Sequence, residues 1–228
     1  MSKLIIMRHG ESEANQKNIF TGWSDVPLTE KGVFEAQKAG NLLNQLDLNI
    51  KMVHTSFLKR AILTSNIILS QINQSYLPIN KSWRLNERHY GALRGLEKNS
   101  VKKEYGEKQY KLWRRSFKEV PPELSDSVIS DSKYLNLGVT EPKAESLEMT
   151  YNRVVPYYNN NVVPKLLDGE NQLIIAHGSS LRALIKYLEN ISDDEIDKVE
   201  VPNGEPIIYT FDDQLNILNK EVIEKENK

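Results

Sequence analysis

The sequence predicts an α/β fold with three layers, in which helices cover both faces of a mixed, mainly parallel sheet. Short apolar segments alternate along the chain with longer segments whose apolar residues recur at helical spacing. Two of the short segments, 4–7 and 173–176, are rich in isoleucine, and a His-Gly pair follows each of them within two residues. Such runs are typical of central parallel strands, which are buried on both faces. The 228 residues fit a single domain.

The first half of the chain predicts two strand–helix pairs and a further extended segment. In order, the expected elements are a strand at 3–7, a helix from Thr29 to Leu46, a strand at 52–55, a helix at 58–72 and an extended segment from Pro78. Thr29 is a suitable N-cap, because its hydroxyl can accept a hydrogen bond from the first turn of a helix. Both predicted helices carry an apolar stripe that can pack on a sheet.

The second half continues the alternation after a polar region. Its expected elements are a polar helix at 98–117, a surface loop at 125–143, a helix at 146–167, a strand at 173–176, a helix at 181–188 and a hairpin of 207–211 with 215–218. Pro121 and Pro122 should stop the polar helix, and Pro156 should kink or split the helix that contains it. We expect the loop at about 119–145 to act as a lid. The charged tail from about residue 220 should be mobile.

Composition excludes several classes of function. The formal net charge is −1, so the chain has no basic field for nucleic acid, and the absence of cysteine rules out disulfides and thiolate chemistry. Apolar runs are all shorter than the roughly 20 residues that a membrane span needs, and no signal sequence precedes the first strand. We therefore expect a cytoplasmic protein that binds neither membrane nor nucleic acid. Metal-ligand spacings, P-loops and dinucleotide fingerprints are also absent.

Two histidines follow the two isoleucine-rich strands. Because ligands of open α/β sheets bind outside the carboxyl ends of the strands, His9 and His177 are expected to meet in one crevice. Gly10 would let the backbone approach an anion closely. His177 precedes a helix whose N–H groups and dipole favour an anion. The alternatives are a solvated loop histidine at 9 and a helix-capping histidine at 177.

Arginine and glutamate residues near these strand ends suit phosphate chemistry. Arg60 lies one turn into a helix whose other face is apolar, and a guanidinium binds phosphate through two parallel hydrogen bonds. Glu87 lies in a polar turn, where a carboxyl group near cations can carry protons. The alternative for Arg60 is a solvated helix arginine. The alternative for Glu87 is a surface ion pair with Arg84 or Arg88.

A second basic group and two further histidines complete the candidates. Lys98, Arg114 and Arg115 would hold a second anionic group of a substrate, although they could also form an ordinary solvated helix face. His54 lies within a predicted strand and is expected to be structural. His89 is expected to be a hydrogen-bonding scaffold rather than a reactive group.

With these residues assembled, the chain resembles the 2,3-bisphosphoglycerate-dependent phosphoglycerate mutases of the histidine phosphatase superfamily, from Leu4 to about Phe211. The Arg8-His9-Gly10 motif marks only the superfamily. The motifs specific to the mutases are Phe20-Thr21-Gly22-Trp23, the segment 81–93 (KSWRLNERHYGAL), Trp113-Arg114-Arg115 with Pro121-Pro122-Glu123-Leu124, and Ser180-Leu181-Arg182-Ala183-Leu184. The resemblance implies a metal-independent isomerase of glycolysis and gluconeogenesis, which interconverts 3- and 2-phosphoglycerate and is primed by 2,3-bisphosphoglycerate.

The resemblance also implies residue roles. His9 would become phosphohistidine, Glu87 would give and take the proton, and His177, Arg8 and Arg60 would stabilise the phosphoryl group. The implied substrate-binding residues are Gly10, Ser12, Asn15, Thr21, Gly22, Arg88, His89, Tyr90, Lys98, Arg114, Arg115, Gly178 and Ser179. The implied partner is a small phosphorylated anion, and homo-oligomerisation is left open.

Some positions depart from the family pattern. Ser179 stands where the family usually has Asn, whereas Ala144 and Asn203 each stand where it usually has Thr. The loop after Leu124 is short and lacks the usual His-Asp-Pro-Arg stretch. No departure removes a charged catalytic group. Three readings other than the main mutase therefore stay open: a phosphatase with the same first step, a divergent mutase paralogue with weak activity, and a binding or scaffolding protein that kept the fold.

Overall fold

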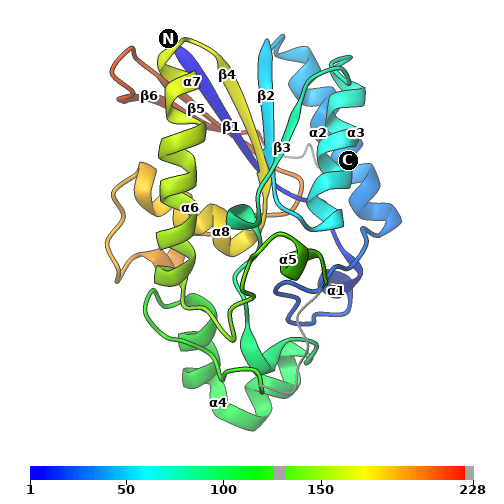
Figure 1. Ribbon diagram of the computed structural model, residues 1–228, viewed down its shortest axis with the longest axis vertical. Helices are drawn as coiled ribbons and strands as arrows, with labels where there is room; N and C mark the ends of the chain where they lie inside the picture. The colour runs from blue at the N-terminus through cyan, green and yellow to red at the C-terminus, as the bar shows by residue number, and fades with distance from the viewer. Residues whose placement is uncertain (126–131, 224–228) are drawn as a thin grey trace.

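The computed structural model describes residues 1–125 and 132–223, and a single mixed sheet organises them (Figure 1). Within these residues the strand order is β3 (Ile79–Lys81), β2 (Ile50–Thr55), β4 (Asn171–Ala176), β1 (Ser2–Arg8), β5 (Pro206–Phe211) and β6 (Ile217–Val222). The first four strands are parallel, while β5 and β6 each pair antiparallel with the preceding neighbour. The prediction of a mixed, mainly parallel sheet is confirmed.

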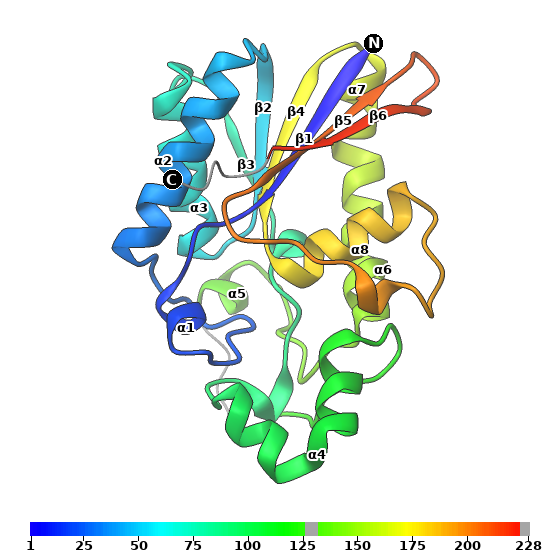
Figure 2. The same ribbon diagram turned by 180° about the vertical axis from the view of Figure 1, so that it is seen from behind.

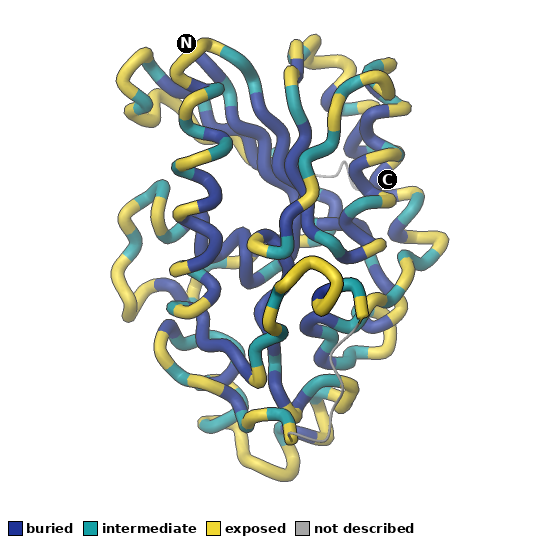
Figure 3. Tube along the Cα trace, viewed as in Figure 1, coloured by how far each residue is buried: buried dark blue, intermediate teal, exposed yellow. Residues whose placement is uncertain are grey.

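Helices cover both faces of this sheet, as Figures 1 and 2 show from opposite sides. On one face α2 (Glu30–Gln45) and α3 (Lys59–Gln71) pack over Ile5 and Met7 of β1. On the other face α6 (Leu147–Asn161), α7 (Val163–Leu167) and α8 (Gly178–Leu188) pack over Leu4 and Ile6. Because successive strand residues point to opposite faces, the apolar run of β1 contributes to both cores. The central strands are accordingly buried along their length (Figure 3).

A second group of elements lies beyond the carboxyl ends of the strands (Figure 1). It consists of α1 (Glu13–Gln16), 3-10 turns at Trp83–Leu85 and Gly91–Leu93, α4 (Lys98–Arg115) and α5 (Ser132–Asn136), with another 3-10 turn at Ile196–Lys198. Gly106 interrupts α4 with a φ of 82°, a conformation that glycine adopts without strain. These elements build the walls around the strand ends, where a ligand of such a sheet binds.

Thr29 caps α2 as predicted, with its hydroxyl accepting a hydrogen bond from the Gly32 N–H. Of the two outcomes predicted for Pro156, a kink or a split, the split is wrong at this position, because Pro156 lies inside α6 and the helix ends at Asn161. The break falls at Val162, just before Pro164. Pro164 lies in the first turn of α7, where its missing N–H has no helical partner to lose.

Two predictions about irregular segments also need correction. The expected loop at 125–143 contains the short helix α5, and its residues 126–131 lie outside the described residues. The expected tail from residue 220 is paired as far as Val222 in β6, where Lys220 forms an ion pair with Glu189. The remainder, 224–228, lies outside the described residues. Among the described residues, no helix is both long and apolar enough to span a membrane.

Candidate active site

The two strand-end histidines lie side by side. His9 follows β1 and His177 follows β4, and these strands are parallel neighbours. The His9 N–H donates to the Ala176 carbonyl, which continues the hydrogen bonding between β1 and β4 as far as the two histidines. The ring centroids are 4.9 Å apart. The structure thus brings the two histidines into one site, as their positions after the strands predict.

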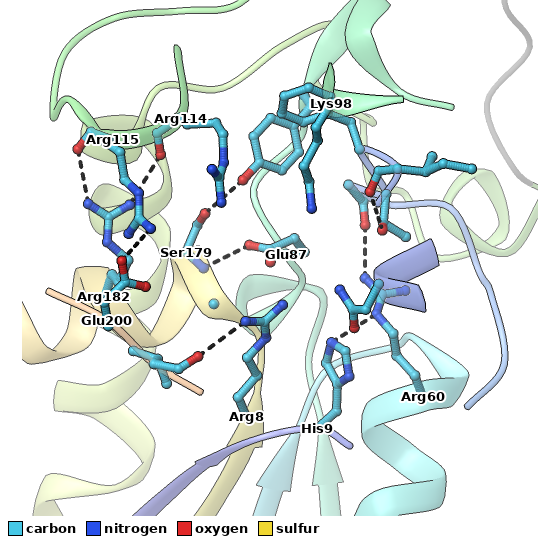
Figure 4. Close-up of a pocket in the computed structure, with 18 residues that line it drawn as sticks. Arg8, His9, Arg60, Glu87, Lys98, Arg114, Arg115, Ser179, Arg182 and Glu200 are labelled. Atoms are coloured by element: carbon cyan, nitrogen blue, oxygen red, sulfur yellow. Dashed lines mark hydrogen bonds and ion pairs between the residues drawn. The ribbon is translucent and has the colours of Figure 1, made fainter. Parts of the chain in front are cut away.

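Hydrogen bonds determine which nitrogen of His9 is free to react. His9 Nδ1 lies 2.6 Å from the Gly10 carbonyl, which can only accept, so Nδ1 carries the proton in the neutral ring. The lone pair is therefore on Nε2, which accepts a hydrogen bond of 3.2 Å from Arg60 Nε. Arg60 is buried, and its other nitrogens donate to the carbonyls of Gly22 and Ser24. It is not a solvated helix arginine, and its side chain points at His9 Nε2 (Figure 4).

His177 contacts His9 but lies outside the residues that line the pocket in front of His9, and it is the N-cap residue of α8. It is fully buried, and its Nε2 is 2.8 Å from the Ser56 hydroxyl, whereas Nδ1 has no hydrogen-bond partner in the described residues. Burial lowers the pKa of both His9 and His177 well below the usual value, and the nearby guanidinium groups of Arg60 and Arg8 lower both further. Both rings are therefore neutral at physiological pH, which is the state in which an imidazole can attack phosphorus.

These lowered pKa values predict how stability depends on pH. Above pH 6.5 the rings of His9 and His177 are neutral in both folded and unfolded chains and contribute nothing to the difference. As the pH falls below 6.5, the two rings bind protons in the unfolded chain but not in the folded chain. The free energy of unfolding therefore falls by up to about 1.4 kcal/mol per pH unit for each ring. Urea unfolding at pH 7.5, 6.5 and 5.5 should show most of the loss in the lower interval. Equal stability at pH 6.5 and 5.5 would contradict the neutral assignment.

Glu87 is held by the backbone beside this pair. Its side chain is buried, and Oε1 accepts hydrogen bonds from the N–H groups of Arg88 (2.8 Å) and Ser179 (3.0 Å). The Arg84 guanidinium stacks on Trp83 instead, and the Arg88 guanidinium donates to the carbonyls at the end of α4. Backbone donors rather than a surface ion pair therefore fix the Glu87 carboxylate in the pocket.

Arg153, which the sequence reasoning missed, anchors the turn that carries Glu87. It donates to both oxygens of Glu145 and to the carbonyls of Arg84, Asn86 and Glu87. The ion pair is buried, with the side chains of Arg153 and Glu145 only 7% and 4% exposed. One side chain of α6 thereby holds three carbonyl groups within residues 84–87 of the loop. Its isolated position in a helical segment gave no signal of this role.

Removing this anchor should destabilise the protein strongly. We expect Arg153→Met to lower the free energy of unfolding by about 3–5 kcal/mol, since the Glu145 carboxylate would stay buried without its partner. The matched control is Lys165→Met, which removes an exposed pair with Asp168 and should cost less than about 1 kcal/mol. Urea denaturation of the two variants measures both effects. Equal losses would show that the buried network does not support the loop.

The pocket in front of His9 is strongly cationic (Figure 4). Its lining residues are Arg8, His9, Asn15, Ile19, Phe20, Thr21, Gly22, Arg60, Glu87, Tyr90, Lys98, Arg114, Arg115, Gly178, Ser179, Arg182, Glu200 and Val201. Arg8 and Arg60 lie on the His9 side, and Lys98, Arg114 and Arg115 lie opposite. Burial lowers the pKa of Lys98. Two separate clusters of cations suit a small ligand with two anionic groups.

Other predicted site residues lie outside this lining. Gly10 contacts Gly32, and a Cβ on Gly10 would lie 2.1 Å from the Gly32 carbonyl oxygen. Ser12 caps α1. Arg88 is buried beneath Tyr90, with its guanidinium 4.7 Å from the ring centroid. The His89 ring accepts from the Gly91 N–H and contacts Glu141. These residues shape the walls rather than face the cavity.

His54 lies away from the pocket, as predicted for a structural histidine. It is fully buried, with Nδ1 2.9 Å from the Tyr157 hydroxyl and Nε2 3.1 Å from Gln172 Oε1. Residues that the sequence reasoning missed include Arg182 and Glu200 in the lining, and Asn203, whose side chain donates to the His9 carbonyl. Arg182 belongs to the mutase motif at 180–184, but only the structure shows that it lines the pocket.

Comparison with known proteins fits this geometry. A family model described as the histidine phosphatase superfamily (branch 1) matches residues 4–221.

The chain belongs to the histidine phosphatase superfamily.

Within this superfamily, relatives named 2,3-bisphosphoglycerate-dependent phosphoglycerate mutase are similar over nearly the whole chain. The Lactobacillus acidophilus protein of that name is 50% identical, covering 98% of this chain and 100% of the relative. The first of two such mutases of Lactobacillus johnsonii is also 50% identical with the same coverage. Among solved structures, phosphoglycerate mutase from Bacillus anthracis superposes with a TM-score of 0.65 at 25% identity, covering 91% of this chain and 88% of that one.

Proposed function

We infer that the chain is a 2,3-bisphosphoglycerate-dependent phosphoglycerate mutase that interconverts 3- and 2-phosphoglycerate through a phosphohistidine. The main structural support is the second group of cations, Lys98, Arg114 and Arg115, opposite His9 in the pocket. A phosphatase needs to bind only one phosphate, whereas a mutase must hold a substrate with a further anionic group at its other end. The named relatives, similar over the full length, support the same assignment.

The proposed reaction begins with the nitrogen that points into the pocket. His9 Nε2 attacks phosphorus, the bond from phosphorus to the substrate oxygen breaks, and Glu87 gives a proton to the departing oxygen. Arg8 and Arg60 neutralise the charge on the phosphoryl oxygens, which is the main requirement for transfer of this group. In the reverse step Glu87 takes the proton from the other hydroxyl as it attacks the phosphohistidine. The phosphate then returns to a different carbon.

We assign His177 to the stabilisation of the phosphoryl group through its contact with the His9 ring. The substrate would be held by two sets of residues. The phosphate set is Asn15, Thr21, Gly22, Gly178 and Ser179, with Gly10 and Ser12 supporting it from outside the lining. The set for the distal groups is Tyr90, Lys98, Arg114 and Arg115, with Arg88 and His89 supporting it from outside the lining.

The primer and the lid are part of the same proposal. The cationic lining suits 2,3-bisphosphoglycerate, which would supply the first phosphoryl group to His9. Closure of the segment at 119–145 would exclude water, which otherwise hydrolyses the phosphohistidine. We place the enzyme in the cytoplasm, where its phosphorylated substrates are held.

One assay separates the mutase from a phosphatase. Purified protein is given 3-phosphoglycerate and a trace of 2,3-bisphosphoglycerate in the presence of EDTA, and both 2-phosphoglycerate and free phosphate are followed. A mutase forms the isomer with little phosphate, and phosphate without isomer would make the protein a phosphatase. Neither product would leave the binding or scaffolding alternative.

A further inference from the structure

Glu200 is an acidic residue in the cationic pocket for which the proposed reaction has no use. Among the described residues of the lining, Glu87 and Glu200 carry the only carboxylates. Glu87 is buried and held by backbone N–H groups, whereas the Glu200 side chain is 68% exposed. Glu200 lies just after the 3-10 turn at 196–198, at the edge of the pocket near Arg115 (Figure 4).

The contacts of Glu200 fall on one substrate-binding cation. Its carboxylate forms an ion pair with Nη2 of Arg115, whose Nη1 donates to the Val199 carbonyl. The Arg115 carbonyl accepts a hydrogen bond from Arg182, which holds the backbone of Arg115 in place. The guanidinium of Arg115 contacts residues 199 and 200. Burial lowers the pKa of Arg8 and of Arg182, and the negative charge of Glu200 opposes part of that fall.

We propose that Glu200 competes with the distal anionic group of the substrate for the Arg115 guanidinium. This inference rests on the proposed function, which assigns Arg115 to that distal group. The Glu200 side chain is 68% exposed and that of Arg115 is 20% exposed, so water screens the pair on the Glu200 side. The Glu200 side chain can therefore turn into solvent when an anion replaces it. Glu200 thus sets the affinity for ligands with two anionic groups and leaves binding of a single phosphate beside His9 unchanged.

The test compares Glu200→Gln with Asp197→Asn. Each substitution removes one negative charge from the same segment, but Asp197 pairs with Lys111 on the outside of α4 and lies outside the pocket lining. By titration calorimetry, Glu200→Gln should bind 2,3-bisphosphoglycerate about two- to fivefold more tightly than the unchanged protein, with orthophosphate binding unaltered. The KM for 3-phosphoglycerate should fall by a similar factor. Asp197→Asn should leave the affinities for both ligands unchanged.

A double-mutant cycle shows whether Arg115 carries the effect. In an Arg115→Gln background, Glu200→Gln should no longer tighten binding of the bisphosphate. Unchanged affinity in Glu200→Gln, equal gains for orthophosphate, or the same gain in Asp197→Asn would each overturn the proposal. A failure of the unchanged protein itself to bind 2,3-bisphosphoglycerate, despite binding orthophosphate, would instead overturn the proposed function and remove the basis of this inference.

Discussion

Replacement of His9 by alanine is expected to abolish acid-labile labelling by 2,3-bisphosphoglycerate and to lower kcat by about 10⁴-fold or more. The reason is geometric: His9 Nε2 carries the lone pair at the end of β1, and Arg60 Nε is 3.2 Å from it. His177 cannot replace it, since it lies outside the pocket lining and its Nε2 already contacts Ser56. Labelling with ³²P followed by acid and alkali treatment measures the effect.

His54 provides the matched control for this experiment. It is equally buried, but both ring nitrogens contact Tyr157 and Gln172 on the far side of the sheet from α3. His54→Gln should keep the acid-labile label per folded molecule, even if its unfolding midpoint falls. A label that survives in His9→Ala would move the nucleophile to another residue and would contradict the proposed mechanism.

Replacement of Glu87 by glutamine is expected to lower the mutase rate by about 10²- to 10⁴-fold. Glutamine keeps the size of the side chain and an oxygen that can accept from the N–H groups of Arg88 and Ser179. The loop should therefore stay in place while the group that carries the proton is lost. The rate of 3-phosphoglycerate isomerisation measures the loss, and thermal unfolding should show little change.

The choice of leaving group isolates the role of Glu87. A dinitrophenyl phosphate leaves as a stable anion and needs no proton, so Glu87→Gln should phosphorylate His9 from this donor at nearly the unchanged rate. If the variant is equally slow with dinitrophenyl phosphate and with 3-phosphoglycerate, Glu87 does not act as the proton donor and has a different function. Arg60 serves as a contrast, because Arg60→Gln should slow transfer from both donors.

The sequence was enough to predict the parts of this fold that depend on local pattern. The isoleucine-rich run of β1 predicted its burial on both faces, and the His-Gly pairs after β1 and β4 predicted that two rings would meet. Arg60 could be placed because the apolar residues of α3 leave one face for it.

Features that depend on tertiary contacts could not be predicted in the same way. Pro156 was expected to kink or split its helix, but α6 continues through it, and packing of α6 on the sheet outweighs the loss of one hydrogen bond. Arg153 holds the Glu87 turn across a long sequence separation, and no local pattern marks it. Glu200 is an ordinary exposed acid in the sequence, and only the fold brings it to Arg115.

The contact between Gly10 and Gly32 has a practical consequence for protein engineering. Each position excludes even a methyl group, since a Cβ on Gly32 would lie 2.0 Å from the Glu11 carbonyl oxygen. The loop that follows β1 and the first turn of α2 are therefore in direct main-chain contact. Chimeras between relatives should exchange residues 8–35 as one segment. A crossover inside that segment would combine a loop from one relative with a helix turn from another, and their main chains need not fit at this close contact.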